Sequence, residues 1–192
     1  MGTTYEGGGG DEILRPINWN LLTAEEAESE WLDLNAWVGW LRFAYGLQPA
    51  TIPPLWHRHD ELVWELSALH TAWLSAYDPE APPGAPLAWH REFVEARHRL
   101  RDWVSTCGTK LDRDRPTRQA TWPGEPPAAA PVERAIENRD IDFKEFVRND
   151  LATRRRLEDE VAHERARDLV DRLGGAGEPS LWRFGSQLST DT

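Results

Sequence analysis

The stretch from Trp56 to Tyr77, WHRHDELVWELSALHTAWLSAY, constrains the fold more than any other part of the sequence. Apolar residues recur in it every three or four positions, which places them on one face of an α-helix. Proline-rich segments bound it on both sides, and prolines are excluded from helix interiors. We expect His59 or Asp60 to cap this helix and the helix to occupy the middle of a small α-helical domain. Its expected core face consists of Leu62, Leu66, Leu69, Trp73 and Ala76, widened by Val63, Leu74 and Tyr77.

A second predicted helix precedes it and runs from a capping box at Thr23 and Glu26 to about Tyr45, with Gly46 as its left-handed cap. This helix is apolar on two sides. Either it is wedged between two layers of the same fold, or its second side binds a partner or a second copy. The first side holds Ala27, Trp31, Leu34, Trp37, Val38, Leu41 and Tyr45, and the second holds Leu32, Ala36, Gly39, Trp40 and Phe43.

A third helix is predicted from about residue 88 to 106, with one apolar stripe and charged residues elsewhere. We expect it to lie on the surface with one side in the core. The stripe comprises Trp89, Phe93, Ala96, Leu100, Trp103 and Val104, and Cys107 extends it.

The rest of the chain divides by composition. Residues 1–16 form a Gly-rich, acidic lead that we expect to be disordered, residues 17–107 a helical core domain, and residues 108–131 a Pro/Ala-rich linker. Residues 132–175 contain a long charged helix, whose N-terminal third packs on the core while the remainder extends into solvent, and 176–192 are a tail. Trp122 is unusual in a linker and is a candidate anchor, and the sequence leaves open whether it docks back onto the bundle. The predicted fold class is therefore all-α: a small Trp-rich three-helix bundle with a long charged C-terminal helix.

Composition limits the classes of function. Eleven Trp residues supply enough apolar area for a core in a short domain, and a net charge of −11 disfavours bulk attraction to nucleic acid or anionic membranes. Cys107 is the single cysteine, so an intrachain disulfide is impossible and a reducing compartment is expected. The sequence has neither a membrane-spanning apolar run nor the pattern of a signal peptide, and we predict a cytoplasmic protein without membrane insertion.

The histidines are the first candidates for chemistry. His57 and His59 resemble half of a metal site, with His70, Glu61 and Cys107 as possible further ligands, but none stands at a characteristic spacing. We therefore predict no metal and no cofactor. His57 and His59 are interpreted as connector and capping residues, and His70 as a core-flanking residue that hydrogen-bonds locally. Cys107 is interpreted as a buried structural thiol, because a helix C-terminus does not activate a thiolate.

Motifs for enzymatic catalysis are also missing from the sequence. It contains neither a phosphate-binding loop nor a GxSxG serine motif, and its many carboxylates form no distinctive pair. We predict a non-enzymatic protein that acts through protein contacts. The predicted partner-binding residues are Trp40, Phe43, Trp64 and Trp122. The alternative is a nucleic-acid-binding regulator that uses the basic segment 97–118, with contacts from Arg97, Arg101, Lys110, Arg113, Arg115 and Arg118.

Three segments within residues 20–125 together resemble the DUF4913 family, an actinobacterial domain of unknown function. They are AEEAESEWLDLNAWVGWLRFAYG, IPPLWHRHDELVWELSALHTAWLSAY and WHREFVEARHRLRDWV. In that family a proline often follows the histidine before the middle helix, whereas Asp60 stands there in this chain. The resemblance implies a helical accessory protein of conjugative or integrative elements, with transfer machinery or a second copy as partner. It implies no active site.

Overall fold

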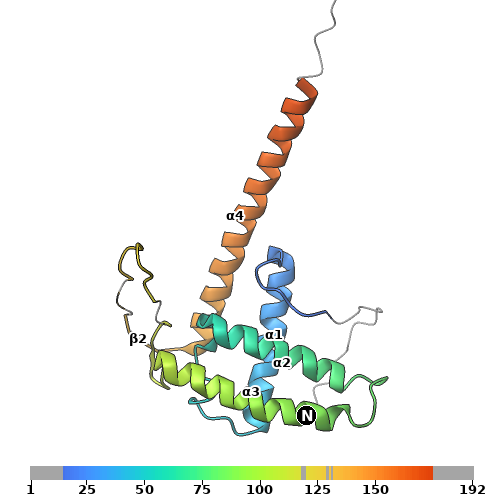
Figure 1. Cartoon of the computed structure of the whole chain (residues 1–192), viewed down its shortest axis with the longest axis vertical. Helices are drawn as coiled ribbons and strands as arrows, with labels where there is room; N and C mark the ends of the chain where they lie inside the picture. Colours follow the sequence, from blue (N-terminus) through green and yellow to red (C-terminus); the bar gives the residue numbers. More distant parts are fainter. Residues whose placement is uncertain (1–14, 118–119, 129, 131, 175–192) are drawn as a thin grey trace, which may run out of the picture.

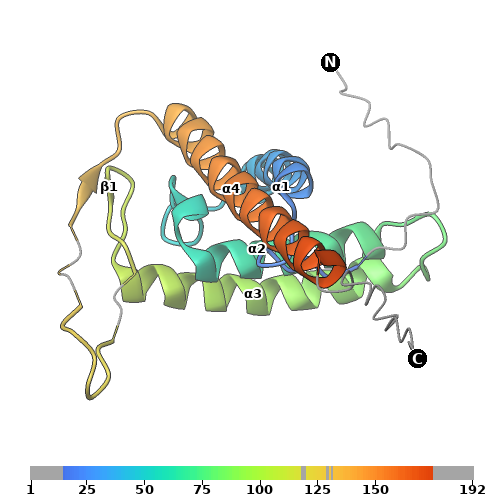
Figure 2. The same ribbon diagram turned by 90° about the horizontal axis from the view of Figure 1, so that it is seen from above.

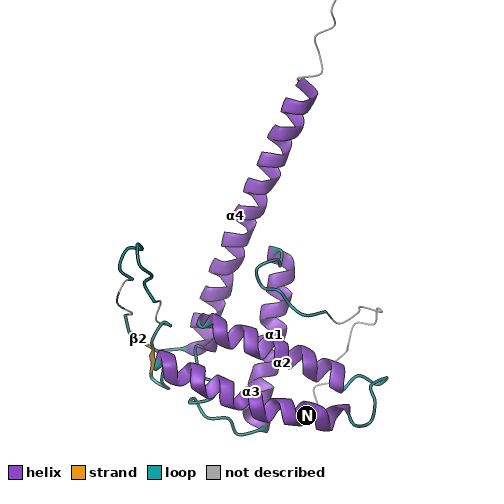
Figure 3. Cartoon of the chain, in the orientation of Figure 1, coloured by secondary structure: helices purple, strands orange, loops and turns teal. Residues whose placement is uncertain are grey.

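The computed structural model describes residues 15–117, 120–128, 130 and 132–174, and these residues form an all-α fold, as predicted. The α-helices are α1 (Ala24–Ala44), α2 (Asp60–Ala76), α3 (Ala85–Cys107) and α4 (Arg139–Gly174), and a 3-10 turn, η1 (Trp56–Arg58), precedes α2. Two short strands, β1 (Arg113–Asp114) and β2 (Arg134–Ala135), pair in antiparallel fashion (Figure 3). Most of the predicted N-terminal lead and the whole predicted tail lie outside the described residues.

Helices α2 and α3 lie side by side and run in opposite directions, whereas α1 crosses them (Figures 1 and 2). Helix α4 packs along α1 with its first turns and then rises away from the other helices (Figure 1). One hydrophobic core joins residues of all four helices, including Phe143, Val147 and Leu151 of α4. The core is therefore larger than the predicted three-helix bundle, because the start of α4 completes it.

Helix α1 begins at the predicted capping box: the Thr23 hydroxyl accepts from the Glu26 amide, and the Glu26 carboxylate accepts from the Thr23 amide. Its first apolar side lies in the core, with Tyr45 partly buried, as the periodicity predicts. The second side is exposed. Among the described residues no element covers it, and a Cβ at Gly39 would meet nothing within 4 Å. The interpretation that α1 is wedged between two layers is therefore wrong.

The core stripes of α2 and α3 are largely as predicted, with two corrections. Trp103 is exposed rather than buried, and Leu74 and Tyr77 project outward instead of widening the core. Helix α3 begins three residues earlier than predicted, because Pro86 occupies its first turn, where a missing amide hydrogen costs nothing. It ends at Gly108, which takes a left-handed conformation with φ 76° and turns the chain back toward α2.

Helix α4 is attached to α1 by polar contacts as well as apolar ones. Asp150 accepts a hydrogen bond from the Trp31 indole at 3.0 Å and pairs with Arg154 at 2.8 Å. Arg154 also donates to the carbonyls of Trp19 and Leu22, just before α1. These charged residues, which interrupt the apolar face of the sequence pattern, thus join α4 to α1. Leu157 and Val161, by contrast, are exposed and do not continue the core face.

The segment after α3 is not simply a linker. Its first part returns to the core, where Thr109 and Asp114 are buried, and β1 then pairs with β2 just before α4. Trp122, further along, is 72% exposed, so it does not dock on the bundle. Of the described helices, none has both the length and the apolar composition needed to cross a membrane.

Candidate functional site

The turn before α2 carries three consecutive polar residues that bind two different elements. His57 Nε2 lies 2.9 Å from Asp142 Oδ1 in the first turns of α4. Arg58 donates to both oxygens of the same carboxylate, at 2.7 and 2.9 Å, and its guanidinium lies over the Phe146 ring. His57 and Arg58 therefore hold the start of α4, and His57 does not converge with His59 on a common point.

His57 is fully buried, and burial lowers its pKa to about 4 despite the hydrogen bond and charge of Asp142. Its Nδ1 is buried without a hydrogen-bond partner among the described residues, as suits a neutral ring that donates through Nε2. Burial also raises the pKa of Asp142, but the hydrogen bonds from Arg58 and His57 outweigh it, and the net shift is downward. The Asp142 carboxylate is thus ionised and held by partners on η1.

His59 points the opposite way, toward the segment after α3. Its Nε2 lies 2.8 Å from Asp114 Oδ1, which also accepts from the Thr109 hydroxyl at 3.0 Å. Its Nδ1 lies 3.3 Å from Thr117 Oγ1 and 3.8 Å from Glu61 Oε1, and Thr117 donates to that same Glu61 oxygen at 2.6 Å. His59 occupies the N-cap position of α2, but its ring makes no capping bond, because it is engaged with these groups.

These neighbouring groups determine the charges of His59 and Asp114. Burial lowers the pKa of His59, but hydrogen bonds to Asp114 and to the Cys107 side chain, together with their charges, outweigh it and raise the pKa to about 9. Burial raises the pKa of Asp114, yet the bonds from His59 and Thr109 and the charge of His59 lower it overall. A positive imidazolium between two acidic side chains is the expected state of this buried cluster at neutral pH.

Cys107, the last residue of α3, is 2% exposed, which agrees with the predicted buried thiol. A ring nitrogen of His59, a carboxylate oxygen of Glu61 and the Cys107 sulfur lie within 4.8 Å of one another. Three of the five residues weighed as metal ligands in the sequence thus meet. The other two, His57 and His70, do not join them.

His70 lies elsewhere in the core. Its ring stacks on Trp37 with centroids 4.8 Å apart, and its Nδ1 is buried without a hydrogen-bond partner among the described residues. Burial lowers its pKa to about 4, so the ring is neutral in the folded protein. The local hydrogen bond that the sequence predicts for His70 is not made by Nδ1, and the ring stacks on Trp37.

The four predicted partner-binding residues do not form one surface. Phe43 is 90% exposed and Trp40 is 43% exposed on the outer face of α1, and Trp40 packs against Trp73 of α2 at 5.2 Å. Trp64 stands nine positions before Trp73, half a turn away on the helix circumference, so it projects from the opposite side of α2. Trp122 lies on the exposed connection between β1 and β2. The outer face of α1 is the largest of these aromatic groupings.

The residues proposed for nucleic-acid contact are distributed over α3 and the segment after it, and several are already bound. The Arg97 guanidinium lies over Phe93, and Arg101 donates to Thr51. Arg113 and Arg115 both pair with Glu133 next to β2. Lys110 is exposed, and Arg118 lies outside the described residues. These pairings reduce the positive charge that the segment presents.

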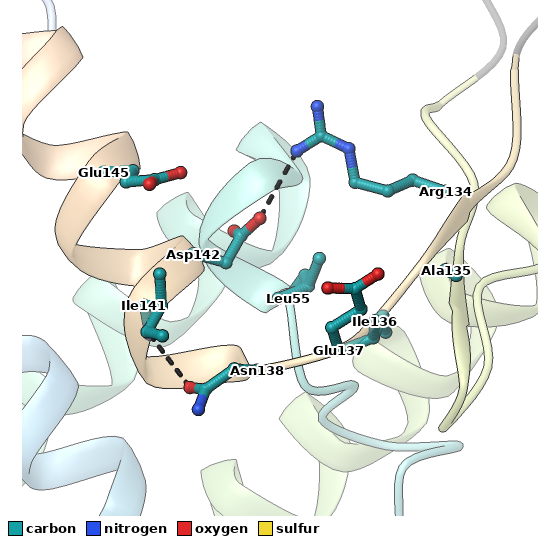
Figure 4. Close-up of a pocket in the computed structure, with 9 residues that line it drawn as sticks. All are labelled: Leu55, Arg134, Ala135, Ile136, Glu137, Asn138, Ile141, Asp142 and Glu145. Atoms are coloured by element: carbon teal, nitrogen blue, oxygen red, sulfur yellow. Dashed lines mark hydrogen bonds and ion pairs between the residues drawn. The ribbon is translucent and has the colours of Figure 1, made fainter.

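A pocket of about 310 Å³ lies between β2 and the start of α4 (Figure 4). Asp142 and Arg134 face each other across it at 3.3 Å, and the side chain of Asn138 accepts from the Ile141 amide. Its central carboxylate, that of Asp142, is bound by His57, Arg58 and Arg134.

Comparison with known proteins identifies no relative. No protein-family model, no curated protein and no solved structure matches the chain. The resemblance to the DUF4913 family stays a prediction. Sequence reasoning missed Asp114, Thr109 and Thr117, whose only signal is a run of short polar residues in a segment rich in charge and proline.

Proposed function

We propose that this protein is a non-enzymatic accessory or adaptor protein that acts through protein–protein contacts. The observation that carries the proposal is the outer face of α1, where Leu32, Trp40 and Phe43 are exposed within about a quarter of the helix circumference. The opposite face of the same helix is embedded in the core, so these side chains are presented on a rigid support.

Exposed aromatic side chains grouped on a rigid element are typical of protein interaction sites, because each buries a large area at a small cost in side-chain entropy. Gly39 and Ala36 lie between them and leave room for the close approach of a partner helix. The neighbouring charged residues would supply the polar rim that such interfaces have.

The exposed part of α4 offers a second surface that is separate from the first. Residues 159–170 are exposed over several turns, and the helix extends well clear of the core (Figure 1). Two separate surfaces are what an adaptor needs to hold two partners. The exposed apolar residues on this part of α4 include Val161, Leu169 and Val170.

The resemblance to the DUF4913 family supports a role beside a conjugative or integrative element, in the cytoplasm. Under this proposal the partners are components of the transfer machinery or a second copy of the chain. The exposed aromatic face supports either, because both would bury it.

Affinity capture of the tagged chain from its host cell, with and without nuclease, tests the proposal. A partner retained after nuclease treatment, and lost when Phe43→Glu is introduced, is the expected result. Val94→Glu is the matched control, since it places the same charge at an exposed apolar position on α3. A partner that disappears with nuclease would favour the nucleic-acid alternative. A strictly monomeric chain that retains no partner would contradict both.

A further inference from the structure

We propose that His59, Glu61 and Cys107 form a binding site for a divalent transition cation of the zinc class, with Asp114 orienting the His59 ring. The three residues come from the turn before α2, the first turn of α2 and the last residue of α3. One ligand atom from each lies within 4.8 Å of the others. The inference does not depend on the proposed adaptor function.

The spacing of these atoms is close to that of a metal site. Ligand atoms about 2.0–2.3 Å from a tetrahedral zinc ion are separated by roughly 3.3–3.8 Å. His59 Nδ1 and Glu61 Oε1 are 3.8 Å apart, which is roughly 0.4–0.5 Å more than the separation of a nitrogen and an oxygen that both bind one tetrahedral zinc ion. The wider separations, which are at most 4.8 Å, must contract by roughly 1.5 Å at most. The Glu61 and Cys107 side chains have rotatable bonds through which the proposed site would make this contraction.

Asp114 supports the site as outer carboxylates support many metal-bound histidines. It accepts from His59 Nε2 at 2.8 Å, which directs Nδ1 toward Glu61 and fixes which ring nitrogen can bind a cation. The Thr109 hydroxyl holds the same Asp114 oxygen at 3.0 Å. An orienting carboxylate that is itself hydrogen-bonded is what a preorganised site requires.

The donor set selects the class of cation. A nitrogen, a sulfur and one carboxylate oxygen suit zinc and similar transition ions, whereas calcium and magnesium take oxygen ligands. Binding would use the thiolate form of Cys107 and the lone pair of a His59 ring nitrogen, the forms in which these side chains bind metals.

The exposure of the ligands and the groups near them fit a site in which three residues bind the cation. The His59 side chain is 0% exposed, and that of Glu61 is 13% exposed, so the carboxylate is the edge through which a cation would arrive. The fourth position would be filled by water or by the Thr117 hydroxyl, which is already 2.6 Å from Glu61. Once bound, the ion would tie α2 to α3 and to the segment that follows α3.

Cobalt(II) titration of the full-length, chelator-treated chain tests the site. The expected result is one equivalent bound, with tetrahedral ligand-field bands and a thiolate-to-cobalt charge-transfer band that zinc displaces. Cys107→Ser should abolish that band, and Asp114→Asn should weaken binding about 10–100-fold. His163→Gln, an exposed histidine on α4, is the matched control and should change neither.

A missing charge-transfer band, or a band that survives in Cys107→Ser, would overturn the proposal. X-ray absorption of the zinc-loaded, unsubstituted chain gives an answer even if a variant fails to fold. One sulfur at about 2.3 Å from zinc is expected. A shell of nitrogen and oxygen alone would mean that the ion binds elsewhere on this acidic protein.

Discussion

His59 and Asp114 are joined by a 2.8 Å hydrogen bond across 55 positions of the sequence, and both are buried. The bond ties the segment after α3 to the beginning of α2. It also replaces the helix-capping role that the sequence predicts for His59, because a ring held between Asp114 and Thr117 is not free to bond the first turn of α2.

Asp114→Asn is therefore expected to destabilise the protein by about 2 kcal/mol, because asparagine keeps the shape but removes the charge opposite the imidazolium. Asp112→Asn is the matched control. Its side chain is 70% exposed, and a change of less than about 0.5 kcal/mol is expected. Urea unfolding at neutral pH, with a chelator present to exclude metal, measures both. Equal effects of the two substitutions would contradict the assigned role of Asp114.

The attachment of α4 depends on Asp142, which is bound by Arg58 and His57. Replacing it with alanine leaves these partners without their carboxylate, and we expect a loss of about 3 kcal/mol in unfolding free energy. Asp140→Ala removes a neighbouring, mostly exposed carboxylate and should cost less than about 1 kcal/mol. Denaturant unfolding of the two variants compares them directly. A loss for Asp142→Ala no larger than that of the control would refute the role of Asp142 in attaching α4.

Sequence periodicity was sufficient to predict the helices and most of the core residues. Burying one face of a helix requires apolar residues three or four positions apart, and this spacing is visible in the sequence. The capping box of Thr23 and Glu26 was equally visible, since both partners lie within one turn. Asp114 gave no comparable signal. Its partner is remote in sequence, and strands of two residues are too short to show an alternating pattern. The start of α3 was misplaced because proline is compatible with a first helical turn.

Charged residues on α4 were the other source of error. Asp150 and Arg154 look like interruptions of an apolar face, and such residues are usually solvated. In the structure they bond to Trp31 and to carbonyls before α1. Local patterns do not reveal such long-range partners, so the depth to which α4 enters the core was not predictable in detail.

Stability should fall in acid partly through His70. The pKa of His70 is about 4 in the folded protein, below its ordinary value of 6.5. Between these values the unfolded chain binds a proton that the folded chain does not, so stability decreases as pH falls. His70→Phe keeps the stacking on Trp37 and removes this dependence. Between pH 7 and pH 5 the variant should gain about 2 kcal/mol relative to the unsubstituted protein.

Urea unfolding at the two pH values measures this difference. His98→Gln, at an exposed position on α3, serves as the control and should show the same pH dependence as the unsubstituted protein. A constant difference between His70→Phe and the unsubstituted chain would show that His70 is protonated in the folded state.

The distal part of α4 should be dispensable for folding. The last contacts that the described structure shows between α4 and the α1 region are those of Arg155 with Glu28 and of Glu158 with the Ala24 amide. Truncation after residue 160 should therefore change the unfolding free energy by less than about 0.5 kcal/mol. Truncation after residue 149, which also removes Leu151 and Arg154, should cost more than about 3 kcal/mol. Circular dichroism and urea unfolding of both truncations check this.

The central claim, that the outer face of α1 binds a protein, is tested most directly by a photo-crosslinking amino acid at position 43. On illumination in the host cell, we predict a single discrete crosslinked species, a partner protein or a second copy of the chain, whose attachment maps to α1. The same amino acid at position 94 of α3 should give no such species. Equal, diffuse labelling from both positions, or none from position 43, would contradict the account.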